Sequence, residues 1–394
     1  MIEILFWSSV ALIVYTYVGF PVISWIRSRV WKRPYIQEDI TPSVSVLIAA
    51  HNEEQSIGEK VRNVLNVDYP ADQLQVIVAS DGSTDRTLMA AQQSGENRVT
   101  VLDLPRAGKA AALNEGILHC DGEIVVFSDA NSMFAVDAIR RIVRSFADPD
   151  VGGVAGDQRY STGASDSAAA DGERSYWGFD RQMKLWQTVS GNVTSATGAI
   201  YAVRRSLFVP VVEGVTDDFI TSTAVIDQGC RLVFDQTAAA YEPVAKSSGV
   251  EFGRKVRVIT RGLRGVLLRR ALLNPFRTGF YSLQLFSHKV LRRQMVFPIL
   301  TLLICSLLLS GSSSLYLAAA ALQLTFYCVA AVGPLAGRFQ SRMTKIISLP
   351  WFFCMVNFAC VVATWRSLSG QQIVLWDPQR SDLPPGSKPA TEKS

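Results

Sequence analysis

Short apolar runs alternate with polar loops and amphipathic segments between residues 42 and 251. A strand that is covered on both faces of a sheet is apolar throughout, so we interpret these runs as buried parallel strands. They cover residues 44–50, 74–79, 99–102 and 124–127. Helical periodicity between the runs predicts an α/β sheet, in which ligands bind beyond the carboxyl ends of the strands.

Long uncharged stretches flank this α/β block. Residues 4–26 form the first stretch, which as a helix is long enough to cross a hydrocarbon layer of about 30 Å. Residues 294–337 form the second, divided by Gly311 and three serines, and residues 346–365 form the third. Together they predict four membrane-spanning helices. Four cations follow the first stretch, so the positive-inside rule puts the α/β block in the cytoplasm.

The pattern divides the chain into six parts. In order, these are an N-terminal transmembrane helix, a basic linker, the catalytic domain, amphipathic interface helices, C-terminal transmembrane helices and a partly disordered tail. Their predicted bounds are 1–26, 27–41, 42–251, 252–293, 294–366 and 367–394. In the fourth part, cations recur at helical spacing from Arg254 to Arg264. We expect them to face lipid phosphates, with an alternative contact to a substrate pyrophosphate.

Charge separates the two ends of the chain. The net charge of the 394 residues is +5, yet the fifteen charged side chains of residues 252–376 are all Lys or Arg, which leaves −10 for the rest. A basic and apolar part is typical of a membrane module and argues against a nucleic acid partner. Six cysteines without a CxxC pair argue against a disulfide scaffold and against a structural zinc site.

Several kinds of chemistry lack their motif. The sequence has no G-x-x-x-x-G-K-[ST] loop for nucleotide phosphates, no G-x-G-x-x-G after the first strand and no G-x-S-x-G nucleophile elbow. These absences argue against P-loop phosphoryl transfer, a dinucleotide site and serine hydrolysis. Acidic side chains at the predicted strand ends remain as the candidates for chemistry.

Three polar residues follow two of the strands. Asp81 lies in a Gly-Ser turn, where it could accept hydrogen bonds from a nucleobase or ribose or simply close its own turn. Asp129 and Asn131 alternate, so both side chains could reach one side and bind a hard cation beside a diphosphate. A solvated strand end is the plain alternative for this pair.

Three further residues lie at helix starts. Asp217 and Asp218 precede an apolar helix, where the helix dipole tolerates two anions and one carboxylate could act as a general base. Capping of the helix is the alternative for one of them. Lys109, in Gly108-Lys109-Ala110, could contact a nucleotide phosphate or ribose, or be an ordinary surface lysine.

The order of these elements is more specific than any one of them. The series AHNEE, SDGSTD, GKAAALNEG, FSDAN, GAIYAVRR, TDDF and RKVR, followed by apolar helices, resembles family-two glycosyltransferases with a GT-A fold. The likeness covers roughly residues 42–300 and is greatest to bacterial membrane-bound exopolysaccharide synthases, such as those of cellulose, hyaluronan and poly-N-acetylglucosamine. It implies a Rossmann-like GT-A catalytic domain in the cytoplasm, joined to an α-helical module in the bacterial inner membrane.

The resemblance also implies a donor site. Ala50, His51 and Glu53 would line the nucleotide pocket. Asp81 would read the base, usually uracil.

The resemblance implies the catalytic residues as well. Asp129 would be the first acid of a D-x-D element that touches the diphosphate and Mg²⁺ or Mn²⁺, with Asn131 in place of the second acid. Asp218 would be the catalytic base, with Asp217 beside it. Arg257 would match the arginine of a Q-x-x-R-W element near the leaving diphosphate.

Two departures from the family pattern bear on function. The neutral amide of Asn131 predicts weaker metal binding than a second aspartate would give. The Q-x-x-R-W element reads Arg254-Lys255-Val256-Arg257-Val258, so the tryptophan that would offer an aromatic face to an acceptor sugar is missing. The second departure bears on whether sugars are added repeatedly.

We therefore expect inverting transfer of a sugar from a nucleotide-diphosphate sugar, with UDP-sugars first, to a polysaccharide or lipid-linked acceptor in exopolysaccharide synthesis. Membrane lipids and other assembly proteins are further expected partners. Three alternatives stay open: transfer of a single sugar to a polyprenyl-phosphate or lipid-linked acceptor, a sugar-nucleotide-forming nucleotidyltransferase, and a non-enzymatic nucleotide-binding subunit of a secretion complex.

Overall fold

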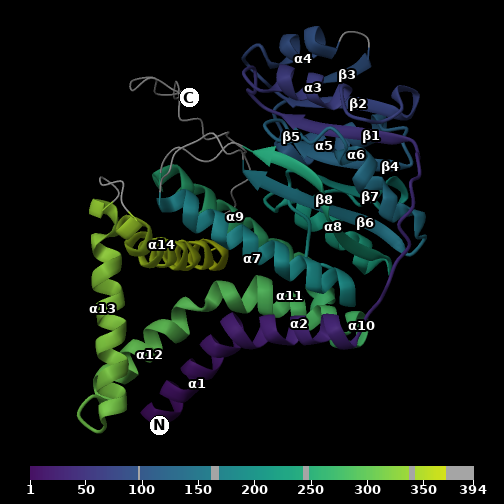
Figure 1. Ribbon diagram of the computed structural model, residues 1–394. Coiled ribbons are helices and arrows are strands. Elements are labelled where there is room, and N and C mark those ends of the chain that lie inside the picture. The colour runs from purple at the N-terminus through teal and green to yellow at the C-terminus, as the bar shows by residue number, and fades with distance from the viewer. Residues whose placement is uncertain (96–97, 161–167, 243–247, 337–341, 370–394) are drawn as a thin grey trace.

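A mixed eight-stranded sheet with helices on both faces forms the catalytic domain (Figure 1). This computed structural model describes residues 1–95, 98–160, 168–242, 248–336 and 342–369. The strand order is β3-β2-β1-β4-β7-β6-β8-β5. The strands are β1 Val44–Ala50, β2 Leu74–Asp81, β3 Val99–Leu104, β4 Ile124–Asp129, β5 Met133–Phe134, β6 Val151–Tyr160, β7 Tyr201–Arg204 and β8 Arg231–Glu242.

The four predicted strands form the parallel half of the sheet, which confirms the predicted α/β class. All seven residues of β1 are buried, as expected for a central strand with helices on both sides. The register pairs Ala50 with Ser80 of β2, and Ala49 with Asp129 of β4. The carboxyl ends of these three strands therefore lie at one edge of the sheet.

Helices cover the two faces of the sheet and bury two apolar cores. The helices α3, α4 and α6 contribute to one core, whereas α5 and α8 contribute to the other. The bounds of the helices in this domain are α3 Ile57–Leu65, α4 Thr87–Gly95, α5 Lys109–Gly116, α6 Ala138–Val143, α7 Ala168–Ser190 and α8 Asp217–Asp227. Both α5 and α8 begin at residues that the sequence singles out, Lys109 and Asp217.

The N-terminal helix is longer than predicted. It comprises α1 (Ile2–Val14), a π-helical turn (Tyr15–Gly19) and α2 (Phe20–Val30), so it ends at Val30 rather than at Ile26. The guanidinium carbon of Arg27 lies 4.3 Å from the ring centroid of Phe280. This cation–π contact joins the charged last turn of the N-terminal helix to the segment at Phe280.

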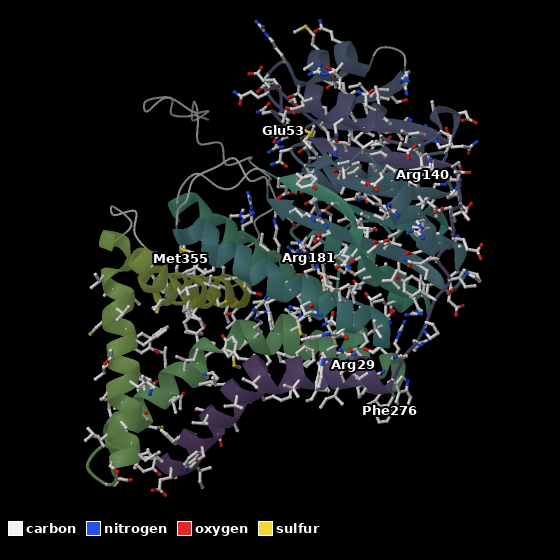
Figure 2. The ribbon with its side chains drawn as sticks, viewed as in Figure 1. Arg29, Glu53, Arg140, Arg181, Phe276 and Met355 are labelled. Atoms are coloured by element: carbon white, nitrogen blue, oxygen red, sulfur yellow. The ribbon has the colours of Figure 1, made fainter. Side chains whose placement is uncertain are left out.

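Six helices follow the catalytic domain within the described residues. They are α9 Ser248–Leu268, α10 Pro275–Thr278, α11 Phe280–Leu285, α12 Val296–Leu309, α13 Ser314–Ala336 and α14 Arg342–Leu368. In Figure 1 they lie with α1 and α2 on one side of the catalytic domain. The side chain of Phe276, on α10, projects from the surface and is 99% exposed (Figure 2).

Within the part of the chain that the structure describes, three helices are long and apolar enough to cross a membrane: Ile2–Val30, Ser314–Gly333 and Leu349–Leu368. A fourth candidate is the pair Phe280–Gln294 and Val296–Leu309, which bends by 51°. The helix α12 has only 14 residues, about 21 Å, so it cannot cross the hydrocarbon layer alone. The prediction that residues 294–337 form two complete spans is therefore wrong for the first of them. The additional length comes from Phe280–Gln294, nearly all of which lies in the part predicted to form amphipathic interface helices, 252–293.

The apolar face of α9 packs against a membrane-type helix. Its residues Val256, Ile259 and Leu263 form a cluster with three small residues of α14, which are Ala359, Cys360 and Ala363. The packing orients the opposite face of α9 toward the catalytic domain, where Arg264 lies against Gly214 and Arg261 lines a pocket. For these two arginines, the predicted orientation toward lipid phosphates is wrong.

Candidate active site

The loops after β1 and β2 are joined by hydrogen bonds. His51, directly after Ala50, donates from Nδ1 to the carbonyl of Asp81 at 2.7 Å. Asn52 has a φ of 52° and accepts from the Thr84 amide at 2.8 Å, while the amide of Glu53 donates to Thr87 Oγ1 at 2.7 Å. The structure thus brings His51 and Glu53 to the edge where the sequence predicts the nucleotide.

Asp81 is almost wholly buried and is held by protein donors at both oxygens. Arg106 donates to Oδ2 at 2.6 Å, and the amides of Ala107 and Gly108 donate to Oδ1 at 2.7 and 2.8 Å. These contacts connect the end of β2 to the start of α5. These three donors use three of the roughly four acceptor sites of the carboxylate.

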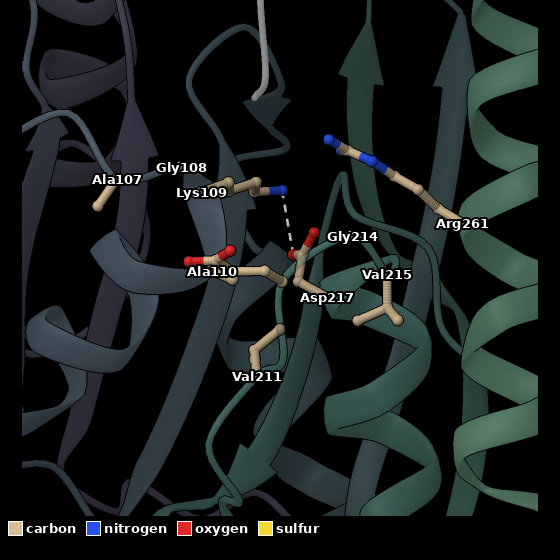
Figure 3. A pocket seen from close by; sticks show the side chains of 10 residues that line it. Ala107, Gly108, Lys109, Ala110, Val211, Gly214, Val215, Asp217 and Arg261 are labelled. Atoms are coloured by element: carbon tan, nitrogen blue, oxygen red, sulfur yellow. Dashed lines mark ion pairs between the residues drawn. The ribbon is translucent and has the colours of Figure 1, made fainter. Parts of the chain in front are cut away.

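Lys109 joins two of the predicted acids. Its Nζ lies 2.7 Å from Asp129 Oδ1 and 3.0 Å from Asp217 Oδ2, and Figure 3 shows the second contact. Burial opposes the charged form of Lys109, but the two carboxylates outweigh it and raise the pKa of the lysine above its ordinary value. Residues from α5, β4 and α8 therefore converge on one point.

Buried side chains hold the turn that carries Asp129 and Asn131. The wholly buried ammonium of Lys60 donates to the carbonyl of Ser132 and lies 3.5 Å from the ring centroid of Phe134. The hydroxyl of Ser132 donates to Glu242 at 2.6 Å, at the end of β8. Burial lowers the pKa of Lys60 and raises that of Glu242. Asn131, which precedes the buried Ser132, is exposed to solvent.

The donor set of this turn fits a hard divalent cation that shares its coordination with a substrate. Asp129 and Asn131 offer oxygen atoms, and a Cβ at Gly198 would lie only 2.9 Å from Asp129 Oδ2, so a glycine is needed there. Among the described residues, no three His, Cys, Asp or Glu side chains form a metal cage. Mg²⁺ and Mn²⁺ sites completed by diphosphate oxygens and water need no such cage.

The surroundings of Asp218 raise the pKa of its carboxyl group. Burial, followed by the neighbouring charge of Asp217, raises its pKa to about 6, while Lys289 and Lys109 act in the opposite direction. Its Oδ1 accepts from the Phe219 amide at 2.8 Å. A carboxylate with a pKa near the working pH can accept a proton in a reaction and release it again.

A pocket lies beside these acids, between the catalytic domain and α9 (Figure 3). It is lined by Ala107, Gly108, Lys109, Ala110, Val211, Glu213, Gly214, Val215, Asp217 and Arg261. Sequence reasoning selected Arg257 from α9, but Arg261, one helical turn later, lines this pocket. Burial, and then the nearby charge of Arg257, lowers the pKa of Arg261, so the two cations are close. The spacing of the arginines was the signal that could have identified both.

The far end of α8 is also anchored. Asp227 pairs with Arg269 at 3.2 Å and with Arg277, next to the exposed Phe276, at 2.7 Å. The helix that begins with Asp217 and Asp218 is thus attached at its other end to the segment between α9 and α11.

The mixed sheet, with acids at the carboxyl ends of its strands, fits the GT-A fold that the sequence resembles. Residues 45–209, less than half of the 394-residue chain, match the family model described as Glycosyl transferase family 2. Over 251 residues it is 28% identical to the poly-beta-1,6-N-acetyl-D-glucosamine synthase of Staphylococcus aureus, covering 62% of this chain. The alignment spans 60% of the length of that relative.

Two further comparisons concern a synthase and a mannosyltransferase. The beta-monoglucosyldiacylglycerol synthase of Synechocystis sp. is 36% identical over 116 residues, which are 28% of this chain and 24% of that protein. The mannosyltransferase PcManGT from Pyrobaculum calidifontis, solved in complex with GDP-Man and Mn²⁺, shares the fold with a TM-score of 0.70 at 23% identity. The match covers 94% of this chain and 100% of the mannosyltransferase, apolar helices included.

Proposed function

We propose that the protein is an inverting glycosyltransferase that moves a sugar from a nucleotide-diphosphate sugar, with UDP-sugars first, to a membrane-associated acceptor in exopolysaccharide synthesis. The observation that carries this proposal is the convergence of Asp129, Asp217 and Lys109 on one point. A structural role alone does not require acids from two distant elements to share one buried cation beside a pocket. The proposed location is the bacterial inner membrane, with the catalytic domain in the cytoplasm, and the candidate membrane spans support attachment to a membrane.

The donor binds across the carboxyl ends of β1, β2 and β4 in this proposal. Ala50, His51, Glu53 and Asp81 surround the nucleotide. Asp129 and Asn131 would hold Mg²⁺ or Mn²⁺, and the cation would offset negative charge on the leaving diphosphate. Lys109 and Arg257 add positive charge on the same side.

Asp218 is the general base. It accepts the proton of an acceptor hydroxyl while that oxygen bonds to the anomeric carbon of the sugar. The bond from the anomeric carbon to the diphosphate breaks as the nucleoside diphosphate leaves from the opposite face. One base and one direct displacement invert the configuration of the sugar without a covalent intermediate on the enzyme.

Transfer of a single sugar to a polyprenyl-phosphate or lipid-linked acceptor is the second candidate. It is favoured by Val258, which stands where the family pattern has a tryptophan and offers no aromatic face to a growing polymer. The similarity to a glucosyltransferase named for a diacylglycerol product supports the same option. A non-enzymatic nucleotide-binding subunit is the third candidate, and turnover by the purified chain would exclude it.

The test is a panel of radiolabelled nucleotide sugars given to the detergent-solubilised full chain, with Mg²⁺, Mn²⁺ or EDTA. Long products would support polymer synthesis, and a single added sugar on a lipid would support the second candidate. Asp218→Asn is the matched inactive variant, and Asp68→Asn, on the surface, is its control. Absence of transfer from every donor, or equal turnover by Asp218→Asn, would contradict the proposed function.

A further inference from the structure

We propose that Tyr201 is a positioning residue for the acids at the start of α8. Its hydroxyl donates a hydrogen bond to Asp217 when a bound donor diphosphate draws Lys109 away from that carboxylate. The inference rests on the proposed function, in which Lys109 adds positive charge beside the diphosphate. Tyr201 belongs to the GAIYAVRR motif, to whose residues the sequence alone assigns no role.

Tyr201 approaches α8 from the sheet beneath it. It is the first residue of β7 and lies opposite Phe127 of β4, and the two rings stack with centroids 4.8 Å apart and 9° between their planes. The ring of Tyr201 belongs to the same apolar core as Phe219 and Ile220 of α8, and the residue is 0% exposed. Tyr201 therefore reaches the helix that begins with Asp217 from within the core.

The hydroxyl of Tyr201 is a buried donor without an acceptor. It neighbours the buried hydroxyl of Thr221, yet neither group has a hydrogen-bond partner among the described residues. Thr221 follows Asp217 by about one helical turn, so the two side chains lie on one face of α8. Burial, followed by the charges of Asp217, Asp218 and Asp129, raises the pKa of Tyr201. The hydroxyl is thus a neutral donor close to three acids.

Stability alone does not account for this hydroxyl. A buried hydroxyl without an acceptor costs free energy, and a phenylalanine would keep the stacked ring without that cost. A tyrosine at this position is explained if its hydroxyl gains an acceptor at another stage of the reaction. The carboxylate of Asp217 is the first of the charges that act on it.

Donor binding supplies that stage. The ammonium of Lys109 is shared between two acids, 2.7 Å from Asp129 and 3.0 Å from Asp217. A diphosphate carries more negative charge than one carboxylate, so its arrival weakens the contact of Lys109 with Asp217. Asp217 then repels Asp218 more strongly, because less positive charge lies between them and the cleft. A hydrogen bond from Tyr201 holds Asp217 in place and thereby preserves the position of Asp218.

A second cation near Asp217 does not replace this hydrogen bond. Arg261, on α9, approaches Asp217 from the side of the pocket that it lines. The donor diphosphate would attract Arg261 as it attracts Lys109. Tyr201 lies in the core, where the diphosphate does not compete for its hydroxyl.

The experiment compares two tyrosine variants of the detergent-solubilised full chain. Tyr201→Phe removes the hydroxyl and keeps the ring that stacks on Phe127. Tyr69→Phe is the matched control, because the Tyr69 hydroxyl is bonded to the carbonyl of Pro42 at 2.5 Å and belongs to the core on the other face of the sheet. Turnover with a saturating donor, the KM for the donor and the melting temperature are measured for each variant.

We expect Tyr201→Phe to lower kcat by about tenfold, the loss of one charge-assisted hydrogen bond, with KM unchanged within about twofold. KM is retained because the buried hydroxyl does not contact the donor. The melting temperature should not fall, since the hydroxyl has no partner to lose in the resting structure. Tyr69→Phe should show the reverse, a lower melting temperature with kcat retained.

Asp217→Asn provides a further check on the partner of Tyr201. Without the negative charge at residue 217, Tyr201→Phe should lower the remaining transfer by less than about threefold. A full tenfold loss in this background, about the effect expected alone, would exclude Asp217 as the acceptor.

The inference is overturned if Tyr201→Phe keeps the kcat of the unaltered chain, or if it melts as far below that chain as Tyr69→Phe does. Transfer by the unaltered chain separates this result from the proposed function. If the unaltered chain transfers no sugar, both fall together. If it transfers sugar and Tyr201→Phe does so equally well, only the role of Tyr201 is wrong.

Discussion

The Nζ atom of Lys109 lies 2.7 Å from Oδ1 of Asp129, although twenty residues separate them in the chain. The same atom contacts Asp217 at 3.0 Å. Without a cation between them, the carboxylates of Asp129 and Asp217 would repel each other in this partly buried site. Lys109 therefore holds the metal-binding turn and the start of α8 together, and with them the position of Asp218.

We expect Lys109→Met to reduce sugar transfer by about 10²–10³-fold, because it removes positive charge near the developing diphosphate and releases Asp217. The measurement is kcat with a saturating donor. Arg140→Met is a suitable control, because Arg140 pairs with Asp68 on the surface of the catalytic domain (Figure 2). Equal losses in both variants would contradict a specific role for Lys109.

The pKa of about 6 for Asp218 predicts an acid limb in the pH dependence of turnover. A base must be ionised to accept a proton, so kcat/KM should fall as the pH drops below about 6. Asp218→Asn should lower kcat by about 10²–10⁴-fold and abolish this limb. If kcat/KM of the unaltered enzyme stays constant between about pH 5 and about pH 8, Asp218 is excluded as the base.

The same raised pKa predicts a change in stability with pH. The folded state binds the proton of Asp218 more tightly than the unfolded state, so its contribution to stability is complete below pH ~4 and is lost as the pH rises through about 6. Asp218→Asn should therefore melt at a higher temperature than the unaltered protein at pH 8, but not at pH 4. Melting curves at both values test the prediction, and no difference at pH 8 would refute it.

Asn131→Asp should strengthen divalent metal binding. A second carboxylate in the turn adds a full charge to the cation site, and at an intermediate dielectric this corresponds to about a tenfold lower dissociation constant. Titration of Mn²⁺ followed by electron paramagnetic resonance measures the effect directly. Asn131→Ala should weaken the binding, and unchanged affinity in both variants would remove residue 131 from the site.

Asp81→Ala tests whether the buried carboxylate organises the start of α5. The substitution leaves Arg106 and the amides of Ala107 and Gly108 without their acceptor, and we expect a destabilisation of about 2–4 kcal/mol. Donor affinity should fall as well, because Lys109 follows directly. Chemical unfolding and UDP binding measure the two effects. An unchanged unfolding free energy would mean that these hydrogen bonds contribute little.

The parallel strands were predictable because their sequence pattern is local. Runs such as residues 44–50 are apolar throughout, and only a doubly covered strand accounts for such a short run between polar loops. Asp129 lies at a predicted strand end and Asp217 at a predicted helix start, and both features are local. The resemblance, which rests on the order of the motifs, predicted that the two residues belong to one site. Exact helix ends were less predictable, as for Val30, because a local pattern does not reveal distant contacts such as that of Arg27 with Phe280.

The partners of buried polar groups could not be predicted from the sequence. Asp81 has Arg106 as its partner because β2 and β3 are neighbours, and several other arginines would satisfy the same pattern. The choice of Arg261 over Arg257 depends on how α9 rotates against α14, which small residues such as Ala359 and Ala363 permit. Lys60 gave no signal at all, since a lysine in an amphipathic helix usually faces solvent.

The attachment of Asp227 to Arg269 and Arg277 makes α8 a short strut between two parts of the molecule. Its eleven residues span about 16 Å, from Asp217 and Asp218 toward α10, which carries Phe276. A rigid helix transmits a shift at one end to the other. A displacement of α10 by the lipid bilayer or by a neighbouring protein would thus move Asp218 relative to the donor and alter the rate without touching the substrate.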